Sequence, residues 1–124
     1  MNKLFIDKKH HKNFMSFINK DGANSDDIER ICLFYILSFH DKFKDNIFKF
    51  YNFKERTINS NVFEEMMFSD GERALIRLAF HLFTGRDDYK ATVCNTFYHL
   101  GGDFLKIAKN AVLIYIGDKK ICVN

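Results

Sequence analysis

The feature that most constrains this chain is an uninterrupted apolar run at residues 31–37, which contains no charged side chain. A helix that is apolar on every side is normally covered by its neighbours in the core of a protein. A buried strand is the competing interpretation, because periodicity alone does not separate the two. Ser25 or Asn24 can cap a helix that begins at Asp26, and the charged first turn favours a helix running to about Phe39.

A second largely apolar segment follows the clearest local signal in the chain. Ser69 and Glu72 have the spacing of a capping box, in which each side chain binds a free backbone N–H at the start of a helix. The apolar residues that follow continue at helical spacing to Gly85, which predicts the end of the helix. We expect this helix to pack against the helix at 26–39.

The remaining segments predict shorter helices around this pair. Their expected ranges are 7–19, 41–51, 61–68, 92–100 and 103–115. Residues 52–60 read as a loop that can hold a short extended piece, and the tail at 118–124 reads as a short strand or a frayed end. The prediction is an all-α protein with one domain over residues 1–124, a single compact bundle of five to seven helices around two central apolar helices.

Bulk properties narrow the class of protein. A chain of 124 residues can bury a core without disulfides or metals, and its fifteen phenylalanines supply large apolar side chains. The three cysteines, Cys32, Cys94 and Cys122, form no CxxC pair, which is typical of reduced thiols in a reducing compartment. No apolar run approaches the ~20 residues of a membrane span. We therefore expect a cytoplasmic protein that needs no cofactor and does not contact a membrane.

A stripe of basic side chains is the best candidate for a binding site. Arg73, Arg77 and His81 are spaced by four, so they lie along one edge of the second apolar helix. Two guanidinium groups on one face can bind a phosphate, a carboxylate or an acidic side chain of a partner protein. The alternative is that the stripe is a solvated or salt-bridged edge, paired with Glu29 or an aspartate.

A metal site is a second candidate, at the start of the chain. Asp7, His10 and His11 fall around one helical turn, and Asp and His at this spacing can share a metal ion. Further ligands would have to come from elsewhere, and HExxH and paired CxxC motifs are absent from the sequence. Asp7 also has a complete alternative role as a helix cap. We expect no metal site.

Two further surfaces are candidates for partners. Residues 42–54 alternate lysines with aromatic residues, a pattern that can bind single-stranded nucleic acid if the rings are exposed. The same rings also form an ordinary core face. An exposed apolar patch can mark a homodimer contact, with a short helix folded onto the core as the alternative. The residues of that patch are Phe63, Met66, Met67 and Phe68.

Three stretches together resemble a known family. They are LFID at 4–7 followed by His11 and Phe14, the pair Glu29-Arg30 followed by LFYIL at 33–37, and SDGERALIRLAF at 69–80. They resemble an uncharacterised family of small helical proteins from low-GC Gram-positive bacteria and their phages, over residues 4 to about 116. The resemblance implies an intracellular setting and a mobile-element origin, and it brings no established reaction or site residue.

The hypothesis that these observations favour is a non-enzymatic protein-binding module. Its most specific form is a phage or mobile-element inhibitor of a bacterial defence complex, such as a CRISPR effector, that acts by occupying a surface. The alternatives are a nucleic-acid-binding module and a small metal-dependent hydrolase that uses Asp7, His10 or His11. The sequence contains none of the GxxxxGK[ST], GxGxxG and GxSxG motifs.

Overall fold

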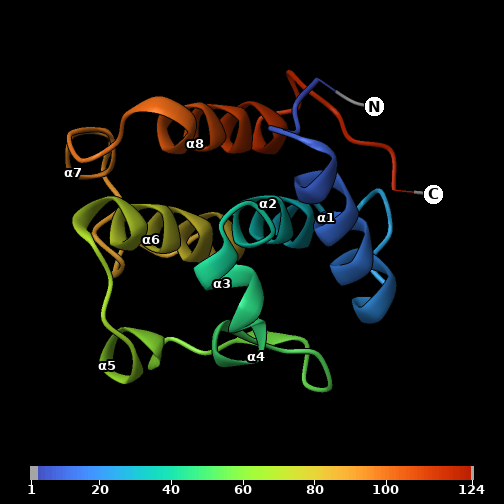
Figure 1. The fold of residues 1–124 in the computed structure, drawn as a ribbon, viewed down its shortest axis with the longest axis horizontal. Helices are drawn as coiled ribbons and strands as arrows, with labels where there is room; N and C mark the ends of the chain where they lie inside the picture. Colours follow the sequence, from blue (N-terminus) through green and yellow to red (C-terminus); the bar gives the residue numbers. More distant parts are fainter. Residues whose placement is uncertain (1–2, 124) are drawn as a thin grey trace.

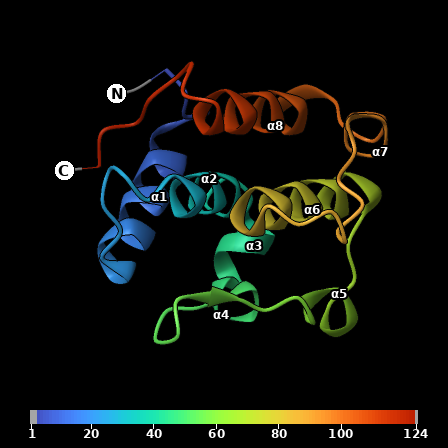
Figure 2. The same cartoon turned by 180° about the vertical axis from the view of Figure 1, so that it is seen from behind.

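The four longest helices of the described residues pack together, and one of them contacts the other three (Figure 1). The computed structural model describes residues 3–123. Helix α2 (Ile28–Leu37) packs against α6 (Asp70–Thr84) in one layer, α8 (Gly102–Tyr115) covers both of them, and α1 (Lys8–Asp21) packs across one end of α2. The view from behind shows the same layers (Figure 2). The apolar run at 31–37 is therefore helical, as expected, and it is central.

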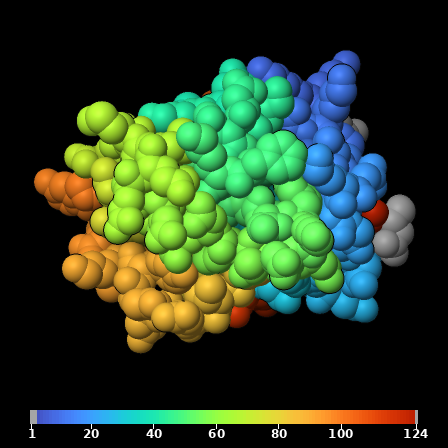
Figure 3. Space-filling view, turned by 90° about the horizontal axis from the view of Figure 1, so that it is seen from below, coloured from blue at the N-terminus to red at the C-terminus, as the bar shows by residue number. Residues whose placement is uncertain are grey.

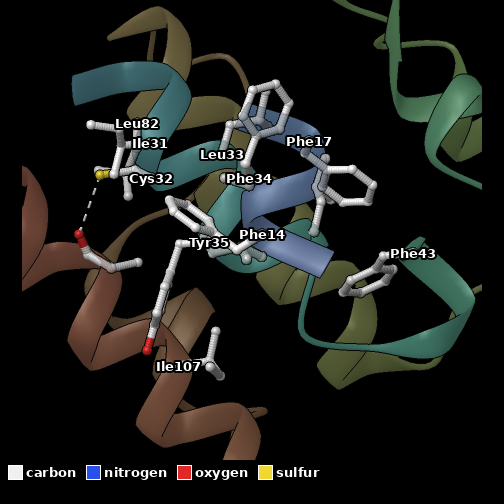
Figure 4. Close-up of a cluster of buried hydrophobic side chains, with 14 of the residues drawn as sticks. Phe14, Phe17, Ile31, Cys32, Leu33, Phe34, Tyr35, Phe43, Leu82 and Ile107 are labelled. Carbon is white, nitrogen blue, oxygen red and sulfur yellow. Dashed lines mark hydrogen bonds between the residues drawn. The ribbon is translucent and has the colours of Figure 1, made fainter. Parts of the chain in front are cut away.

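Every side chain of α2 from Ile31 to Leu37 is buried, because a neighbour covers each face of the helix. Figure 4 shows Phe34 among the core rings and Tyr35 directed toward α8. Cys32 donates its thiol hydrogen to the carbonyl of Ala111, 3.6 Å away on α8. Burial raises the pKa of Cys32 to about 12, so this thiol is a small core residue and not a nucleophile. Cys94 and Cys122 are exposed.

The predicted caps set the ends of two helices. Asp7 accepts a hydrogen bond from the backbone N–H of His10 at the start of α1, and Gly22 ends that helix with a φ of 78°. At the start of α6 the capping box is complete, since both the Ser69 and the Glu72 side chains bind backbone N–H groups. Both helices begin within one residue of the predicted position.

The segment between α2 and α6 forms an arm of short elements, which is the green region in Figure 1. Its elements are α3 (Asp41–Asp45), α4 (Ile47–Phe50), β1 (Tyr51–Asn52), β2 (Thr57–Ile58) and α5 (Val62–Glu65). The strands pair antiparallel, with Tyr51 opposite Ile58. One helix was expected over 41–51, but it divides at Asn46, whose side chain binds the carbonyl of Lys42 and competes with the helical backbone.

The prediction of a mostly helical chain is confirmed. The described residues contain eight helices, the last short one being α7 (Val93–Phe97), and one two-stranded sheet. Five to seven helices were expected, and the division of the 41–51 helix raises the number. The segment after α8 has no helix or strand within the described residues, yet Ile121 and Val123 are buried against the core and anchor it. Asn124 lies outside the described residues.

A network of charged groups holds the hairpin of β1 and β2 against α1 and α2. The side chain of Asp21, at the end of α1, is fully buried. Its carboxylate accepts hydrogen bonds from the Tyr51 hydroxyl at 2.5 Å and from the Arg56 guanidinium at 2.9 Å. Arg30 on α2 donates to the Tyr51 hydroxyl and to the carbonyl of Arg56, and it forms an ion pair with Asp27. Burial and the Asp21 carboxylate raise the pKa of Tyr51 to about 12, which keeps the hydroxyl protonated.

His10 joins the N-terminal segment to α2. Its Nε2 lies 2.8 Å from the carbonyl of Tyr35 and therefore carries the hydrogen, while Nδ1 accepts from the backbone N–H of Ile6. Both ring nitrogens are thus occupied in the neutral form. Burial lowers the pKa of His10 to about 4, even though the carbonyl of Tyr35 favours the charged form.

The free energy of unfolding will therefore fall as the pH decreases through the range in which unfolded histidine titrates. Unfolded His10 binds a proton below about pH 6.5, but folded His10 does so only near pH 4. We expect a loss of about 2 kcal/mol between pH 8 and pH 5, measured by urea denaturation. His10→Gln should have lower stability at pH 8 and little pH dependence in this window. A wild-type stability that stays level from pH 8 to pH 5 would contradict this role for His10.

Glu72 also makes the free energy of unfolding depend on pH, but it does so at lower pH than His10. Burial alone would raise its pKa, but bonds from the Ser69 backbone N–H, His40 and Lys42 lower the pKa of Glu72 to about 2. Its contribution is complete above about pH 4.5 and is lost between about pH 4.5 and pH 2. The two residues therefore act in different pH ranges.

Candidate functional site

The basic stripe lies on one face of α6, as its spacing predicts. Arg73, Arg77 and His81 are each partly buried. The guanidinium of Arg77 lies 5.9 Å from the centre of the Phe63 ring, which α5 supplies. His81 Nδ1 lies 2.7 Å from the carbonyl of Arg86, so this nitrogen carries the hydrogen. The face is therefore held by contacts from two other segments of the chain.

The segment that follows α6 returns along this face and forms two shallow grooves with it. The first groove, of about 230 Å³, is called the arginine groove here, and its lining residues are Phe63, Arg73, Arg77, Asp88, Tyr89 and Lys90. The second groove, of about 300 Å³, is lined by His81, Asp87, Ala91 and Thr92. In the space-filling view this returning segment, in gold, lies at one side of the green arm (Figure 3). The grooves place all three stripe residues next to solvent-filled space.

Within residues 3–123, no carboxylate lies within the 4 Å of an ion pair from Arg73 or Arg77. Glu29, which was considered as a partner, lies beside Arg30 instead. Asp88 lines the groove, but its carboxylate forms an ion pair with Arg86 at 2.7 Å. The salt-bridged interpretation of the stripe therefore does not hold in the part of the chain that the structure describes. Two partly buried cations therefore face the groove, and residues 3–123 provide no carboxylate in ion-pair range of either.

Exposed apolar side chains lie on the neighbouring segments. Val93 and Tyr98, at the two ends of α7, are 74% and 86% exposed, and Met67, just before α6, is 88% exposed. Helix α7 packs against α6. Tyr, Met and Arg are the residue types that protein interfaces enrich, so this end of the molecule has the composition of a contact surface.

The structure does not bring the candidate metal ligands together. Asp7 caps α1 through the N–H of His10, and both ring nitrogens of His10 are occupied. The His11 ring packs edge-on against Phe5. Among the described residues, no three His, Cys, Asp or Glu side chains are grouped so that they could hold a metal ion.

The aromatic residues of the lysine-rich segment at 42–54 mostly face the core. Phe43 and Phe50 are fully buried, whereas Phe48 is 67% exposed and lies under the ammonium group of Lys20. Lys42 binds Glu72 and the carbonyl of Met67. The segment therefore presents one well-exposed ring, Phe48, beside the half-buried Phe53, which is less than a continuous stacking platform for bases.

The proposed dimer patch is largely packed against the molecule itself. Phe63 and Phe68 contact each other and further core rings, and Met66 packs beside them. Of the four residues, Met67 alone is exposed. The alternative of a short helix folded onto the core therefore describes α5 better.

Sequence reasoning found the arginines but missed the rest of their groove. Asp88, Tyr89 and Lys90 come from an irregular segment that has no periodicity to place it beside α6. Phe63 comes from the far side of the arm. The charged residues at 86–88, directly after the helix-ending Gly85, were the one local signal. They did not indicate that the chain turns back along α6.

Comparison with known proteins identifies the family and leaves the activity open. None of the helices in the described residues is long and apolar enough to cross a membrane. Neither the curated proteins nor the solved structures include a match to this chain. The model of one family matches residues 1–115, which is most of the chain. The chain belongs to that family, which is described as a family of unknown function, DUF6075.

Proposed function

We propose that this chain is a protein-binding module and that the arginine groove is its contact surface. The observation that carries the proposal is the pair of partly buried guanidinium groups, Arg73 and Arg77, with no carboxylate in ion-pair range among residues 3–123. A cation that is partly removed from water gains most from an external carboxylate, because the local dielectric constant is lower there. The partner therefore supplies an acidic side chain to the groove.

The surroundings of the groove support a protein partner over a small anion. Val93, Tyr98 and Met67 add exposed apolar area at the same end of the molecule. Aromatic residues and arginines carry much of the binding energy at protein interfaces. A small anion would use the arginines alone, whereas a protein surface would use both groups.

In its most specific form, the proposal makes the chain an inhibitor encoded by a phage or mobile element. It would bind a bacterial defence complex, such as a CRISPR effector, and block the surface that the complex needs. The small size of the chain and its resemblance to proteins of bacteria and their phages support this form. No enzymatic step is required of it.

The test compares wild type with Arg73→Ala/Arg77→Ala. Both proteins are tagged and used to capture partners from bacterial lysate, and the affinity for the recovered partner is then measured with purified components. We expect at least a tenfold weaker affinity for the double variant, since interface arginines often contribute ~2 kcal/mol or more each. Lys49→Ala/Lys54→Ala serves as the control, because both lysines are exposed on the arm and form no ion pair among the described residues.

Two results decide the proposal. A double variant that folds normally and keeps full affinity removes the arginine groove from consideration. For the inhibitor form, expression of wild type should raise phage plating efficiency in cells with an active CRISPR system, and the double variant should not. Equal plating with and without the wild-type protein rejects that form.

A further inference from the structure

Four lysines surround a second hollow, separate from the arginine groove. We call it the lysine hollow; it measures about 300 Å³, and its lining residues are Lys3, Leu4, Lys106, Asn110, Lys119 and Lys120. They come from two distant parts of the chain, the N-terminal segment on one side and α8 with the residues directly after it on the other. Figure 1 shows these parts meeting at the C-terminal end of α8, in blue and red.

The backbone that carries these lysines is anchored. The carbonyl of Leu4 accepts hydrogen bonds from the buried Tyr35 hydroxyl and, at 3.4 Å, from the side-chain amide of Asn110. The same amide lies 3.0 Å from the Tyr35 hydroxyl. On the other side, Ile121 and Val123 are buried. The backbone around the hollow is therefore held in place without a ligand, which reduces the entropic cost of ordering it on binding.

The charge of the hollow is concentrated. The chain as a whole has a formal net charge of +3, and Lys3, Lys106 and Lys119 alone bring three positive charges to one concave surface. In the described part of the chain, Lys3, Lys106 and Lys119 form no ion pair with a carboxylate. Like charges around one hollow repel each other, and an anion bound between them would relieve that repulsion.

We propose that the lysine hollow binds an anion with clustered phosphates, such as the triphosphate of a free nucleotide or the backbone of a nucleic acid. Lysine binds phosphate as a flexible point charge, so several lysines suit a ligand with several phosphate groups. A volume of about 300 Å³ is at the lower end for small-molecule sites and is enough for a di- or triphosphate. A single carboxylate would engage only part of the charge.

A neighbouring pocket offers a place for the rest of such a ligand. It has a volume of about 270 Å³, shares Lys119 and Lys120 with the lysine hollow, and has an apolar wall. The wall consists of Ile28, Ile31, Ile114 and Ile121. A base attached to the phosphates would find apolar surface there, whereas bare polyphosphate would not use it.

The probe for the test is sodium tripolyphosphate, titrated into the protein by calorimetry at low salt. We expect wild type to bind it and Lys106→Ala/Lys119→Ala to bind at least tenfold more weakly. Both lysines are exposed, so the variant should fold normally, which circular dichroism verifies. The control Lys49→Ala/Lys54→Ala changes two exposed lysines on the arm, away from the hollow. Its affinity for tripolyphosphate should match that of wild type within about twofold.

The source of the phosphates follows from two further titrations. A nucleoside triphosphate that binds more tightly than tripolyphosphate indicates a free nucleotide, in agreement with the isoleucine wall. An oligothymidylate that binds more tightly, with an affinity that falls steeply with salt, indicates a nucleic-acid backbone. Both would lose affinity in Lys106→Ala/Lys119→Ala.

Two outcomes overturn the proposal. One is the absence of tripolyphosphate binding to wild type at low salt and millimolar probe. The other is equal binding by wild type and Lys106→Ala/Lys119→Ala. The protein-binding function fails or holds separately, because Lys106→Ala/Lys119→Ala lies outside the arginine groove and should keep full affinity for the protein partner.

Discussion

Replacing Phe34 with alanine will lower the free energy of unfolding by about 3–5 kcal/mol. The Phe34 side chain is fully buried in α2, and its ring centre lies 5.0 Å from that of Tyr51 and 5.9 Å from those of Phe17 and Phe53. Alanine would leave a cavity among rings that belong to two other segments of the chain, α1 and the hairpin of β1 and β2, and those segments cannot both move inward to fill it. Urea denaturation with two-state analysis measures the change.

Phe48→Ala is the matched control, because it removes the same ring from an exposed position. Phe48 is 67% exposed and contacts Phe53 and Lys20. We expect Phe48→Ala to cost less than about 1 kcal/mol. A similar loss for both variants would show that the protein is not centred on α2. Because small domains have only about 5–15 kcal/mol of stability in total, Phe34→Ala is also expected to reduce the yield of folded protein.

Removal of the buried carboxylate in Asp21→Ala will cost about 3–4 kcal/mol. Asp21 is the common acceptor for Tyr51 and Arg56, so its loss leaves the hydroxyl without its acceptor and removes the charge that pairs with Arg56. Arg56 is partly exposed and can be hydrated, which places the estimate toward the lower end of the range for broken buried ion pairs. Thermal and urea unfolding both measure the loss.

Asp21→Asn separates the role of charge from the role of shape. The amide oxygen can still accept from Tyr51, so we expect a smaller loss, of about 1–2 kcal/mol, from the weaker bond to Arg56. Raising the salt concentration should reduce the difference between wild type and Asp21→Asn, because Arg56 is reached by solvent. If Asp21→Ala were as stable as wild type, the network would not hold the hairpin of β1 and β2 in place.

The sequence predicted those parts of the fold that depend on local signals. Asp7, Ser69 and Glu72 bind backbone N–H groups close to them in sequence, so spacing alone placed the starts of α1 and α6. The apolar run of α2 predicted burial on all sides for a similar reason, since its composition leaves no polar face. These features need no knowledge of distant residues.

The sequence did not predict features that depend on distant contacts. The hairpin of β1 and β2 is only two residues long on each strand, and Arg56 adopts a φ of 56° that its residue type does not favour. Contacts with Asp21 and Arg30 support that conformation, and nothing in residues 51–58 indicates them. The short strands therefore depend on tertiary contacts.

The candidate site likewise has one part that the sequence predicts and another that only the three-dimensional structure shows. Spacing along one helix identified Arg73, Arg77 and His81, but the absence of a carboxylate partner within residues 3–123 became visible only in three dimensions. The lysine hollow combines residues separated by more than one hundred positions, so no sequence window contains it. His10 shows the reverse case, in which a residue type that suggested a metal ligand has an internal structural role.

The position of α2 also bears on how the chain is made. One of the helices that bury α2 is synthesised long after it. Cys32 binds the carbonyl of Ala111 on α8, and α8 is the last helix of the described residues. At ~5–20 residues per second, a ribosome finishes α2 roughly 3–13 s before it begins α8. Throughout that interval the nascent chain carries an apolar helix with one side open. The yield of folded protein in cells will therefore depend on translation rate and on chaperone capacity, even for variants whose final stability equals that of wild type.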